Sequence, residues 1–340
     1  MKKLKPKYKR YLQIRSRRQM KNKKRNGNPR SLRQSTSGLI PRNHTLSFID
    51  VPTPIVFKLQ YEHCEEVISY INKIKGIGRS GRHMNIIMDD IIDIGEGAIS
   101  MLLSVMEELV REGIIFTGTK PKQPIPRGIL EKSGFFKFVK GKIDESNSTT
   151  KNTILNTGDN QTPQSELAEE IIKSMETVWG QKGRSPSIYS CVFEMMRNAC
   201  DHAFKNENQI RWHFALSHSE IDNLVKFSFV DNGKGIIRTF TEGILKNFLN
   251  LFNDNLDIVE TAFTNGIASR TGLSWRGKGL PTIYENYDDG HLNNLVVISN
   301  NVYIDFDRKI RHKLKNSFSG TYYYWKVDQS CTKECFEIKN

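Results

Sequence analysis

The positive charge of this chain is confined to one end. Residues 1–42 contain 16 Lys and Arg and no Asp or Glu, whereas the other 298 residues contain 35 basic and 37 acidic side chains. A stretch with so many like charges and few apolar side chains repels itself and cannot bury a core, so it is predicted to be a disordered basic tail. Folding must therefore begin near Leu46, with a body close to neutral, and this excludes a histone-like body.

Composition divides the rest of the chain into two predicted domains. A length of 340 residues favours about two domains of roughly 150 residues each. Residues 141–163 are rich in Ser, Thr, Asn and Gln, as is typical of a linker, although residues 153–155 could form a short strand within it. We therefore expect one domain over residues 46–140 and a second over residues 164–330.

The sequence also predicts where the protein resides. It contains no run of 18 apolar residues, so no helix is expected to span a membrane. The charged N-terminal stretch is not followed by an apolar segment, as a secretory signal would require. The five cysteines include no CxxC pair, which favours a reduced protein without structural disulfides. A cytoplasmic location is the expectation.

Hydrophobic periodicity gives each domain a different character. In the first, strands and helices alternate, which indicates a small α/β layer; strands are expected at 55–60, 84–92 and 113–118, and helices at 62–74, 97–111 and 127–133. In the second, two helices precede most of the strands; the helices are expected at 164–179 and 186–204, and the strands at 210–217, 223–230, 294–299, 302–306 and 320–327. This order indicates an α+β sandwich with helices on one face of a mixed sheet.

Two glycine-rich segments resemble phosphate-binding motifs without meeting their requirements. Residues 76–81 (GIGRSG) follow a predicted helix and precede a strand, the reverse of a dinucleotide-binding turn, so we expect an ordinary turn. Residues 272–279 (GLSWRGKG) end in glycine where a P-loop needs a Ser or Thr hydroxyl for magnesium. Neither segment alone predicts a nucleotide site.

Three other segments of the second domain point to chemistry. In residues 194–204 (EMMRNACDHAF), Glu194, Asn198 and His202 are spaced four apart and so form one polar stripe on a helix. A carboxylate and a carboxamide placed in this way could hold magnesium and orient a nucleophile, or they could simply face solvent. Asp231 ends an apolar strand and begins DNGKGI, where an acid and nearby glycines could meet a ligand or form a hairpin turn. In RGKGLPTI (276–283), a glycine pair opens a helix-like run whose N–H groups could bind phosphate.

In this order and spacing, the three segments resemble the N, G1 and G2 boxes of the Bergerat-fold (GHKL) ATPases, a family that includes gyrase and the histidine kinases. The Ser-Gly-Thr at 319–321 is similar to the last Gly-Thr element of that family. The resemblance covers about residues 160–330. Residues 194–204 are most similar to the serine-kinase anti-sigma branch. No phosphoacceptor box with the HExR pattern precedes the domain, so histidine autophosphorylation is not expected.

The resemblance implies ATP and Mg²⁺ as cofactors and assigns a role to each matching residue. Asn198 would coordinate magnesium and Glu194 would be the candidate general base. Residues 236–275 would form a lid over the nucleotide. The remaining assignments concern nucleotide binding: Asp231 with the adenine amino group, Gly233 and Gly235 with the base pocket, Gly277 and Gly279 with the phosphates, Lys278 and Leu280 as nucleotide-binding residues beside them, and Thr321 with the adenine side.

The first domain resembles a STAS domain, the fold of anti-sigma antagonists. The likeness covers residues 84–140 and is carried best by the segment Leu130, Ser133, Gly134 and Phe135. The phosphoacceptor serine of that family usually follows the strand that ends here near Gly95, but the nearest hydroxyl is Ser100, inside the next helix. The usual phosphorylation switch is therefore not expected, and the region could be a simple interaction domain.

Together these features predict an ATP-binding regulatory protein, with hydrolysis or protein serine phosphorylation left open. A regulatory protein partner would bind through the STAS-like domain or the lid, and a homodimer is also open. One alternative is a nucleotide-sensing interaction module without turnover. Another is a polyanion-binding protein whose residues 1–42 bind nucleic acid or an anionic surface.

Overall fold

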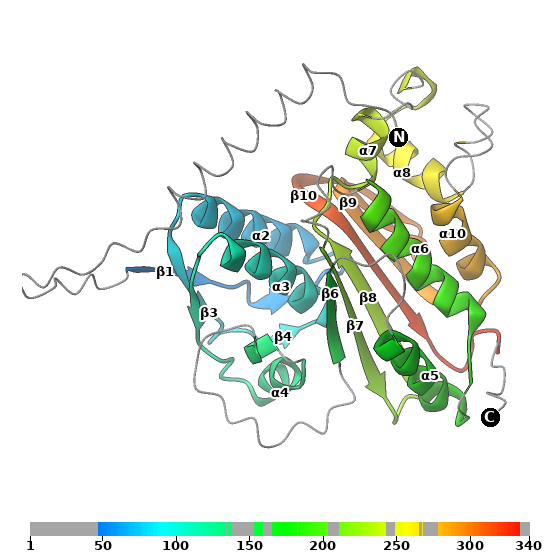
Figure 1. Ribbon diagram of the computed structural model, residues 1–340, viewed down its shortest axis with the longest axis horizontal. Helices are drawn as coiled ribbons and strands as arrows, with labels where there is room; N and C mark the ends of the chain where they lie inside the picture. The colour runs from blue at the N-terminus through cyan, green and yellow to red at the C-terminus, as the bar shows by residue number, and fades with distance from the viewer. Residues whose placement is uncertain are drawn as a thin grey trace, which may run out of the picture. The chain divides into compact units, whose positions relative to one another are not determined.

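A computed structural model describes most of the chain beyond the basic tail. The described residues are 47–133, 135–137, 153–158, 165–181, 183–202, 211–242, 249–264, 267 and 278–333. The predicted tail, residues 1–42, lies outside them, as does most of the predicted linker. Mixed α/β structure with both parallel and antiparallel sheets is found in the described part (Figure 1).

The N-terminal region contains two small parallel sheets. Strand β3 (His83–Ile87) pairs with β1 (Phe48–Pro52) on one side and β5 (Phe116–Gly118) on the other. A second sheet joins β2 (Val56–Phe57) to β4 (Asp93–Ile94). Strand β1 was not predicted, and the strands expected at 55–60 and 84–92 are shorter in the structure. The parallel pairing follows from the connections, because the chain between two paired strands crosses over through a helix and does not return through a tight turn.

Three helices accompany these strands: α2 (Cys64–Arg79), α3 (Glu96–Arg111) and α4 (Pro124–Lys132). A 3₁₀ turn, η1 (Phe135–Lys137), follows α4. The GIGRSG segment lies mainly in the last turn of α2, where a Cβ on Gly78 would lie 2.6 Å from Leu109 Cδ1 of α3. Gly78 therefore permits close packing of α2 against α3, and the prediction of a simple turn was only partly right. Within the described ranges, no helix has the length and apolar character needed to cross a membrane.

The C-terminal region is built on a five-stranded sheet with the order β6-β7-β8-β10-β9. Its strands are β6 (Thr153–Gly158), β7 (Arg211–Ser219), β8 (Leu224–Asp231), β9 (Asn293–Asp305) and β10 (Ile310–Val327). All four described pairings are antiparallel, so the mixed sheet expected here is wrong. Tight turns after β7 and β9 bring the chain back beside itself, which produces the β7–β8 and β9–β10 pairings. The expected linker contributes β6 to the edge of the sheet.

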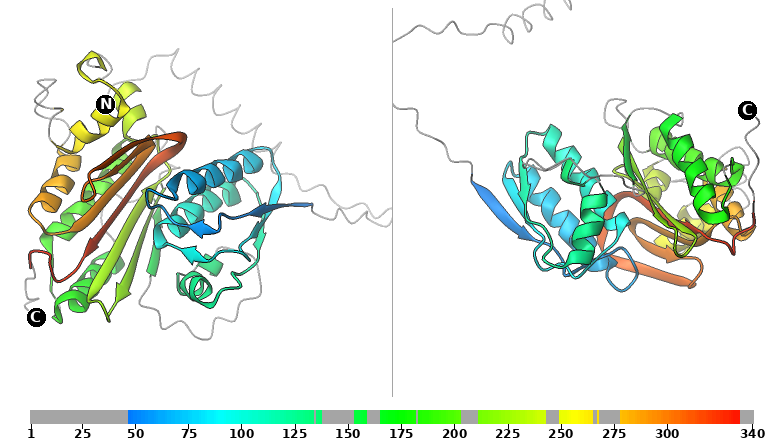
Figure 2. Two further views of the ribbon diagram at one scale, coloured as in Figure 1. Left: turned by 180° about the vertical axis from the view of Figure 1, so that it is seen from behind. Right: turned by 90° about the horizontal axis from the view of Figure 1, so that it is seen from below.

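Both faces of this sheet are covered by helices (Figures 1 and 2). On one face, α5 (Ser165–Trp179), α6 (Pro186–His202), α8 (Asn255–Phe263) and α10 (Gly279–Asp288) share a core with Phe229 and Tyr323. On the other face, α2 and α3 pack against Val230 and Tyr322. Consecutive residues of one strand thus lie in different cores, because side chains alternate along a strand. The helices of the first predicted domain cover the second face of the sheet.

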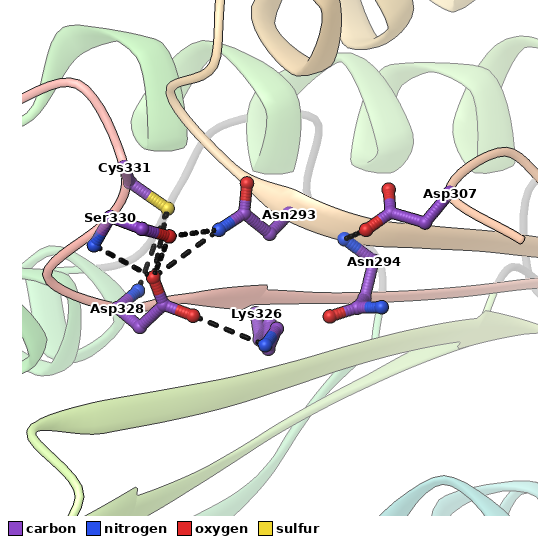
Figure 3. Close-up of polar contacts among 7 residues, drawn as sticks. All are labelled: Asn293, Asn294, Asp307, Lys326, Asp328, Ser330 and Cys331. Atoms are coloured by element: carbon purple, nitrogen blue, oxygen red, sulfur yellow. Dashed lines mark hydrogen bonds and ion pairs between the residues drawn. The ribbon is translucent and has the colours of Figure 1, made fainter.

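A polar turn fixes the end of β10 to the start of β9 (Figure 3). The Asp328 carboxylate accepts hydrogen bonds from Asn293 Nδ2 at 3.2 Å and from the Ser330 N–H at 2.9 Å. Lys326 Nζ lies 3.1 Å from the second carboxylate oxygen. Burial acts to raise the pKa of Asp328, but the contacts with Ser330 and Lys326 outweigh it and hold the pKa below its usual range. Because every contact closes the turn itself, the cluster is structural.

Candidate functional site

Asp231 ends β8, where it lies opposite Thr321 in the antiparallel pairing with β10. Its carboxylate accepts a hydrogen bond from the Gly233 N–H at 2.8 Å, and hydrogen bonds from Thr321 also reach it. The side chain is buried, and burial raises the pKa of Asp231 to about 7, although the Gly233 and Thr321 hydrogen bonds and Lys75 oppose the rise. The structure therefore places an acid of unusually high pKa at the end of a central strand.

The segment after Asp231 leads into helix α7 (Ile236–Glu242), so it is not the hairpin turn that its composition also allowed. Strand β9 holds this segment. Ser299 Oγ accepts from the Ile236 N–H at 2.8 Å, while Asn300 Oδ1 accepts from the Ile237 N–H at 3.0 Å. Asn300 Nδ2 also donates to the Lys234 carbonyl oxygen at 2.8 Å. Ser299 and Asn300 thus accept hydrogen bonds from N–H groups at the start of α7 that have no partner within the helix.

Gly235 is needed for this arrangement. Its φ is +77°, a left-handed conformation that side chains rarely adopt, and a Cβ there would lie 2.5 Å from Asn300 Oδ1. Gly233 is buried in the same segment. The sequence predicted both glycines but not Ser299 or Asn300, because a polar pair within an apolar strand gives no indication of which loop it contacts.

Glu194 and Asn198 of α6 face the first residue of α10. A Cβ on Gly279 would lie 2.6 Å from Glu194 Oε2 and 3.2 Å from Asn198 Oδ1. Only a residue without a side chain lets the start of α10 come this close to Glu194 and Asn198 of α6. Arg197 lies on the outer side, with its guanidinium 3.5 Å from Glu194 Oε1. The polar stripe therefore meets the glycine segment, and a purely solvated face is excluded for Glu194 and Asn198.

The remaining predicted residues of this group are placed less completely. Lys278 is exposed at the N-terminal end of α10, and Leu280 is half-buried against the core beneath the helix. Gly277 lies outside the described residues, as does the side chain of His202. Of the expected lid, 236–275, the described residues include α7 and α8.

Tyr323 lies between the two groups of predicted residues. It is fully buried in β10, two positions after Thr321 and therefore on the same face of the strand. Burial raises the pKa of Tyr323 far above its usual range; the charge of Asp231 adds to the rise, and a contact with Asn198 opposes it. Asn198 Nδ2 is itself buried without a hydrogen bond of standard geometry in the described residues. Tyr323 thus contacts Asn198 of one group and is affected by the charge of Asp231 of the other, a role that sequence reasoning missed.

The described residues fit a magnesium ion bound together with phosphates better than an ion held by protein alone. Among them, no group of three or more His, Cys, Asp or Glu side chains is arranged to hold a metal. Glu194 and Asn198 offer two oxygen ligands beside the glycine that begins α10. Magnesium usually takes one or two protein oxygens and completes its shell with substrate phosphates and water. These two side chains match that pattern.

The side of the site that faces the first domain is closed by α3. Ser104 Oγ donates to Asn232 Oδ1 at 3.0 Å, and Asn232 Nδ2 donates to the Ser104 carbonyl oxygen at 2.7 Å. Ser100, one turn earlier, is fully buried, donates to the Glu96 carbonyl oxygen at 3.0 Å and lies 3.5 Å from the hydroxyl of Ser228. The nearest hydroxyl to the usual STAS phosphorylation position is therefore inaccessible in this structure.

The predicted site residues other than Gly277 lie in the described part and form two groups. One joins Asp231, Gly233, Gly235 and Thr321; the other joins Glu194, Asn198, Lys278, Gly279 and Leu280. Comparison of the chain with protein-family models, with curated proteins and with solved structures finds no match in any of the three.

Proposed function

We propose that residues 164–330 bind ATP together with Mg²⁺ in the manner of the Bergerat-fold ATPases. The observation that carries the proposal is Asp231, a buried carboxyl at a strand end that Gly233 and Thr321 orient through hydrogen bonds. Nearby Gly235 has a left-handed conformation and no room for a side chain, so the loop beside Asp231 stays narrow. The adenine amino group is a hydrogen-bond donor that such a carboxylate accepts. Neutral hydrogen-bonding groups could bind the amino group, but a charged acceptor binds it more strongly.

The second group of residues supports a role with the phosphates. The N–H groups at the start of α10 are unpaired within the helix, as in other anion-binding helix termini, and the adjacent Lys278 is exposed. Gly277 and Leu280 belong to the same segment by sequence. Asn198 would hold magnesium, which would neutralise phosphate charge when bound, and Glu194 beside it would stay free to act as the base. Thr321 would support the adenine side through Asp231.

Glu194 is the residue that distinguishes turnover from binding alone. As a general base it would take the proton of an attacking water or serine hydroxyl, while the hydroxyl oxygen bonds to the γ-phosphorus and ADP leaves. The products would be phosphate or a phosphoserine. A module that senses nucleotide without turnover remains the second candidate, since a carboxylate in this place can also orient water without accepting its proton.

We further propose that the protein is a cytoplasmic regulator. The STAS-like region would supply a surface for a protein partner, and its helices α2 and α3 contact the sheet that carries the nucleotide site. A homodimer would fit such a regulator equally well. Residues 1–42, with 16 basic and no acidic residues, would bind nucleic acid or another anionic surface as a separate activity.

The test is isothermal calorimetry on the full chain with ATP, with and without Mg²⁺. The full chain is needed because α2 and α3 cover one face of the sheet, and an isolated second domain would expose that face. We expect binding that magnesium strengthens and that GTP does not reproduce, because guanine carries an oxygen where adenine carries its amino group. Absence of ATP binding by a folded full-length protein would refute the proposal.

A further inference from the structure

A row of three buried polar side chains crosses the middle of the five-stranded sheet. Asp231 of β8 lies opposite Thr321 of β10, and Thr321 lies opposite Ser299 of β9. Cross-strand partners point to the same face of a sheet, so the three side chains lie side by side on the face that carries Phe229 and Tyr323. They are only 6%, 4% and 0% exposed, respectively. Buried polar groups are costly unless they are hydrogen-bonded, so the bonds within this row matter for the site.

The Ser299 hydroxyl has three polar neighbours. Its Oγ accepts from the Ile236 N–H at 2.8 Å, and it lies 3.3 Å from Thr321 Oγ1 and 3.3 Å from the Gly320 carbonyl oxygen. Thr321, in the middle of the row, also bonds through its hydroxyl to the Asp231 carboxylate. The contacts therefore run without interruption from the start of α7 to Asp231.

The direction of each hydrogen bond follows from the number of protons. A hydroxyl has one proton, and an ionised carboxylate can only accept, so the Thr321 proton goes to Asp231. The Thr321 oxygen is then left as an acceptor. Ser299 already accepts from Ile236, so its own proton is available for Thr321 Oγ1, with the Gly320 carbonyl as the competing acceptor. Donation to Thr321 gives a chain in which every proton points toward Asp231, and such chains strengthen each bond in turn.

The chain leaves the Asp231 carboxylate with acceptor capacity only. Its described donors are Thr321 and the Gly233 N–H, the latter at 2.8 Å. A carboxylate has about four acceptor sites, so it can take a further donor from a ligand. The amino group of adenine is such a donor, whereas the oxygen that guanine carries at the same ring position is an acceptor and would be repelled.

We propose that Ser299 is a positioning residue for base selection: its hydroxyl donates to Thr321 and so holds the Thr321 hydroxyl toward Asp231, which keeps the carboxylate directed at a purine amino group. The inference rests on the proposed function of Asp231. It gives Ser299 a second role besides its contact with α7. It also makes the amino substituent of the purine the feature on which Ser299 acts.

The test compares two nucleosides by calorimetry on the full chain. Adenosine carries the amino group, and purine riboside is the same molecule with hydrogen in its place. Ser299→Ala removes the hydroxyl, and Ser299→Thr keeps it. Ser228→Ala is the matched control, because Ser228 is a buried serine of the neighbouring strand β8 that contacts Ser100 of α3 instead.

We expect Ser299→Ala to lower the affinity for adenosine by about three- to tenfold, the range for one hydrogen bond, and to leave the affinity for purine riboside within about twofold. Ser299→Thr should retain the wild-type preference, and Ser228→Ala should change neither affinity. If Ser299 served only to hold α7, both nucleosides would lose affinity by the same factor, and that result would overturn the inference.

A double-mutant cycle locates the path through Thr321. Thr321→Val keeps the shape of the side chain but breaks the chain between Ser299 and Asp231. In this background, Ser299→Ala should cause no further loss of adenosine affinity, because the two changes interrupt the same chain. A second loss of the same size as in the wild type would show that Ser299 acts through α7 or the Gly320 carbonyl, which contradicts the inference.

A measurement without ligand separates this inference from the proposed function. Carbon-detected NMR follows the titration of the Asp231 carboxyl, and Asp231→Asn identifies its signal. Loss of the Ser299 hydroxyl should weaken the Thr321 donation and raise the midpoint by about 0.3 pH unit, a twofold change in the ionisation constant. Equal midpoints in wild type and Ser299→Ala would overturn the inference. If the wild type binds neither nucleoside, the proposed function fails, and the midpoints still decide whether Ser299 acts on Asp231.

Ser299→Cys replaces Ser299→Ala if the alanine variant does not fold. The thiol keeps the size of the side chain but is a weak donor. The same loss of preference for adenosine over purine riboside is expected, and an unchanged preference in a folded Ser299→Cys protein would count against the inference.

Discussion

Ser104 and Asn232 hold each other through two hydrogen bonds although 128 positions separate them in the sequence. Ser104 belongs to α3 of the first domain, and Asn232 immediately follows Asp231. The contact therefore fixes the first residue of the segment that leads from β8 into α7. It attaches one predicted domain to the candidate nucleotide site of the other.

Replacing Ser104 by alanine should weaken nucleotide binding without unfolding the protein. Ser104→Ala removes the hydroxyl donor to Asn232 but keeps the backbone acceptor, so we expect a loss of about 1 kcal/mol in the free energy of unfolding. ATP affinity should fall by about two- to tenfold. Ser100→Ala is the matched control, since Ser100 is also buried on α3 but contacts Ser228. Equal affinities in the two variants would mean that Ser104 only stabilises the fold.

Asp231→Asn should reduce ATP affinity by roughly ten- to a hundredfold. A carboxylate is replaced by a neutral amide, and the loss of one charge-assisted hydrogen bond costs about 1.5–3 kcal/mol. Calorimetry near pH 8 is the measurement, because Asp231 is then mostly ionised. Asp305→Asn is the control, since Asp305 is buried as well but binds the Arg308 N–H at the end of β9. An unchanged affinity in a folded Asp231→Asn protein would remove the adenine assignment.

The raised pKa of Asp231 also predicts how stability depends on pH. Because its pKa is about 7 in the folded protein and 3.8 in an unperturbed side chain, the folded state holds more protons between these values. The free energy of unfolding should therefore decrease as the pH rises from about 4 to about 7, by at most about 4 kcal/mol, and then level off. Urea unfolding of wild type and Asp231→Asn at several pH values isolates this contribution. Parallel pH profiles would show that Asp231 titrates normally.

Glu194→Ala separates binding from turnover. We expect ATP affinity to change little, and any hydrolysis or phosphotransfer to fall by about 10²–10⁴-fold through loss of the general base. ADP release and calorimetry are measured on the same preparation. Glu285→Ala, on an exposed position of α10, serves as the control. Turnover that persists at the wild-type rate in Glu194→Ala would favour the nucleotide-sensing alternative.

Deleting residues 1–42 should abolish polyanion binding and leave ATP binding unchanged. If eight of the 16 cations contact duplex phosphates, the slope of log K against log salt concentration should be about −7 for the full chain, at about −0.9 per phosphate. The shortened protein should have a slope near zero. Retention of a steep slope after the deletion would place the polyanion site on the folded body.

The sequence predicted those elements whose periodicity is strong and local. Helices expected at 97–111 and 164–179 agree with α3 and α5 to within one residue. Strand β1 was missed because its few residues follow the basic tail without a clear alternation. The strands expected at 294–299 and 302–306 are one strand, β9, because Asn300 and Asn301 continue it. Strand β10 begins earlier than expected, and this added part pairs with β9 alone.

The candidate site was predictable only where one side chain defines the chemistry. Asp231, Glu194 and the glycines belong to patterns that can be read locally. The supporting residues do not: Ser299 and Asn300 contact α7 from more than 60 positions away, and Ser104 binds Asn232 from a different predicted domain. Their side chains are common in strands and helices, and only the contacts of α3 and β9 with the loop give them a role.

The strand order β6-β7-β8-β10-β9 has a consequence for biosynthesis. Of the strands in the described residues, β10 is synthesised last, yet it lies inside the sheet, between β8 and β9, and carries Tyr322 into one core and Tyr323 into the other. The apolar faces of helices α2 and α3 therefore lack their β10 contacts until residues up to about Tyr322 have been translated. Such a nascent chain folds late through contacts of long sequence separation, and it depends on protection from aggregation during synthesis.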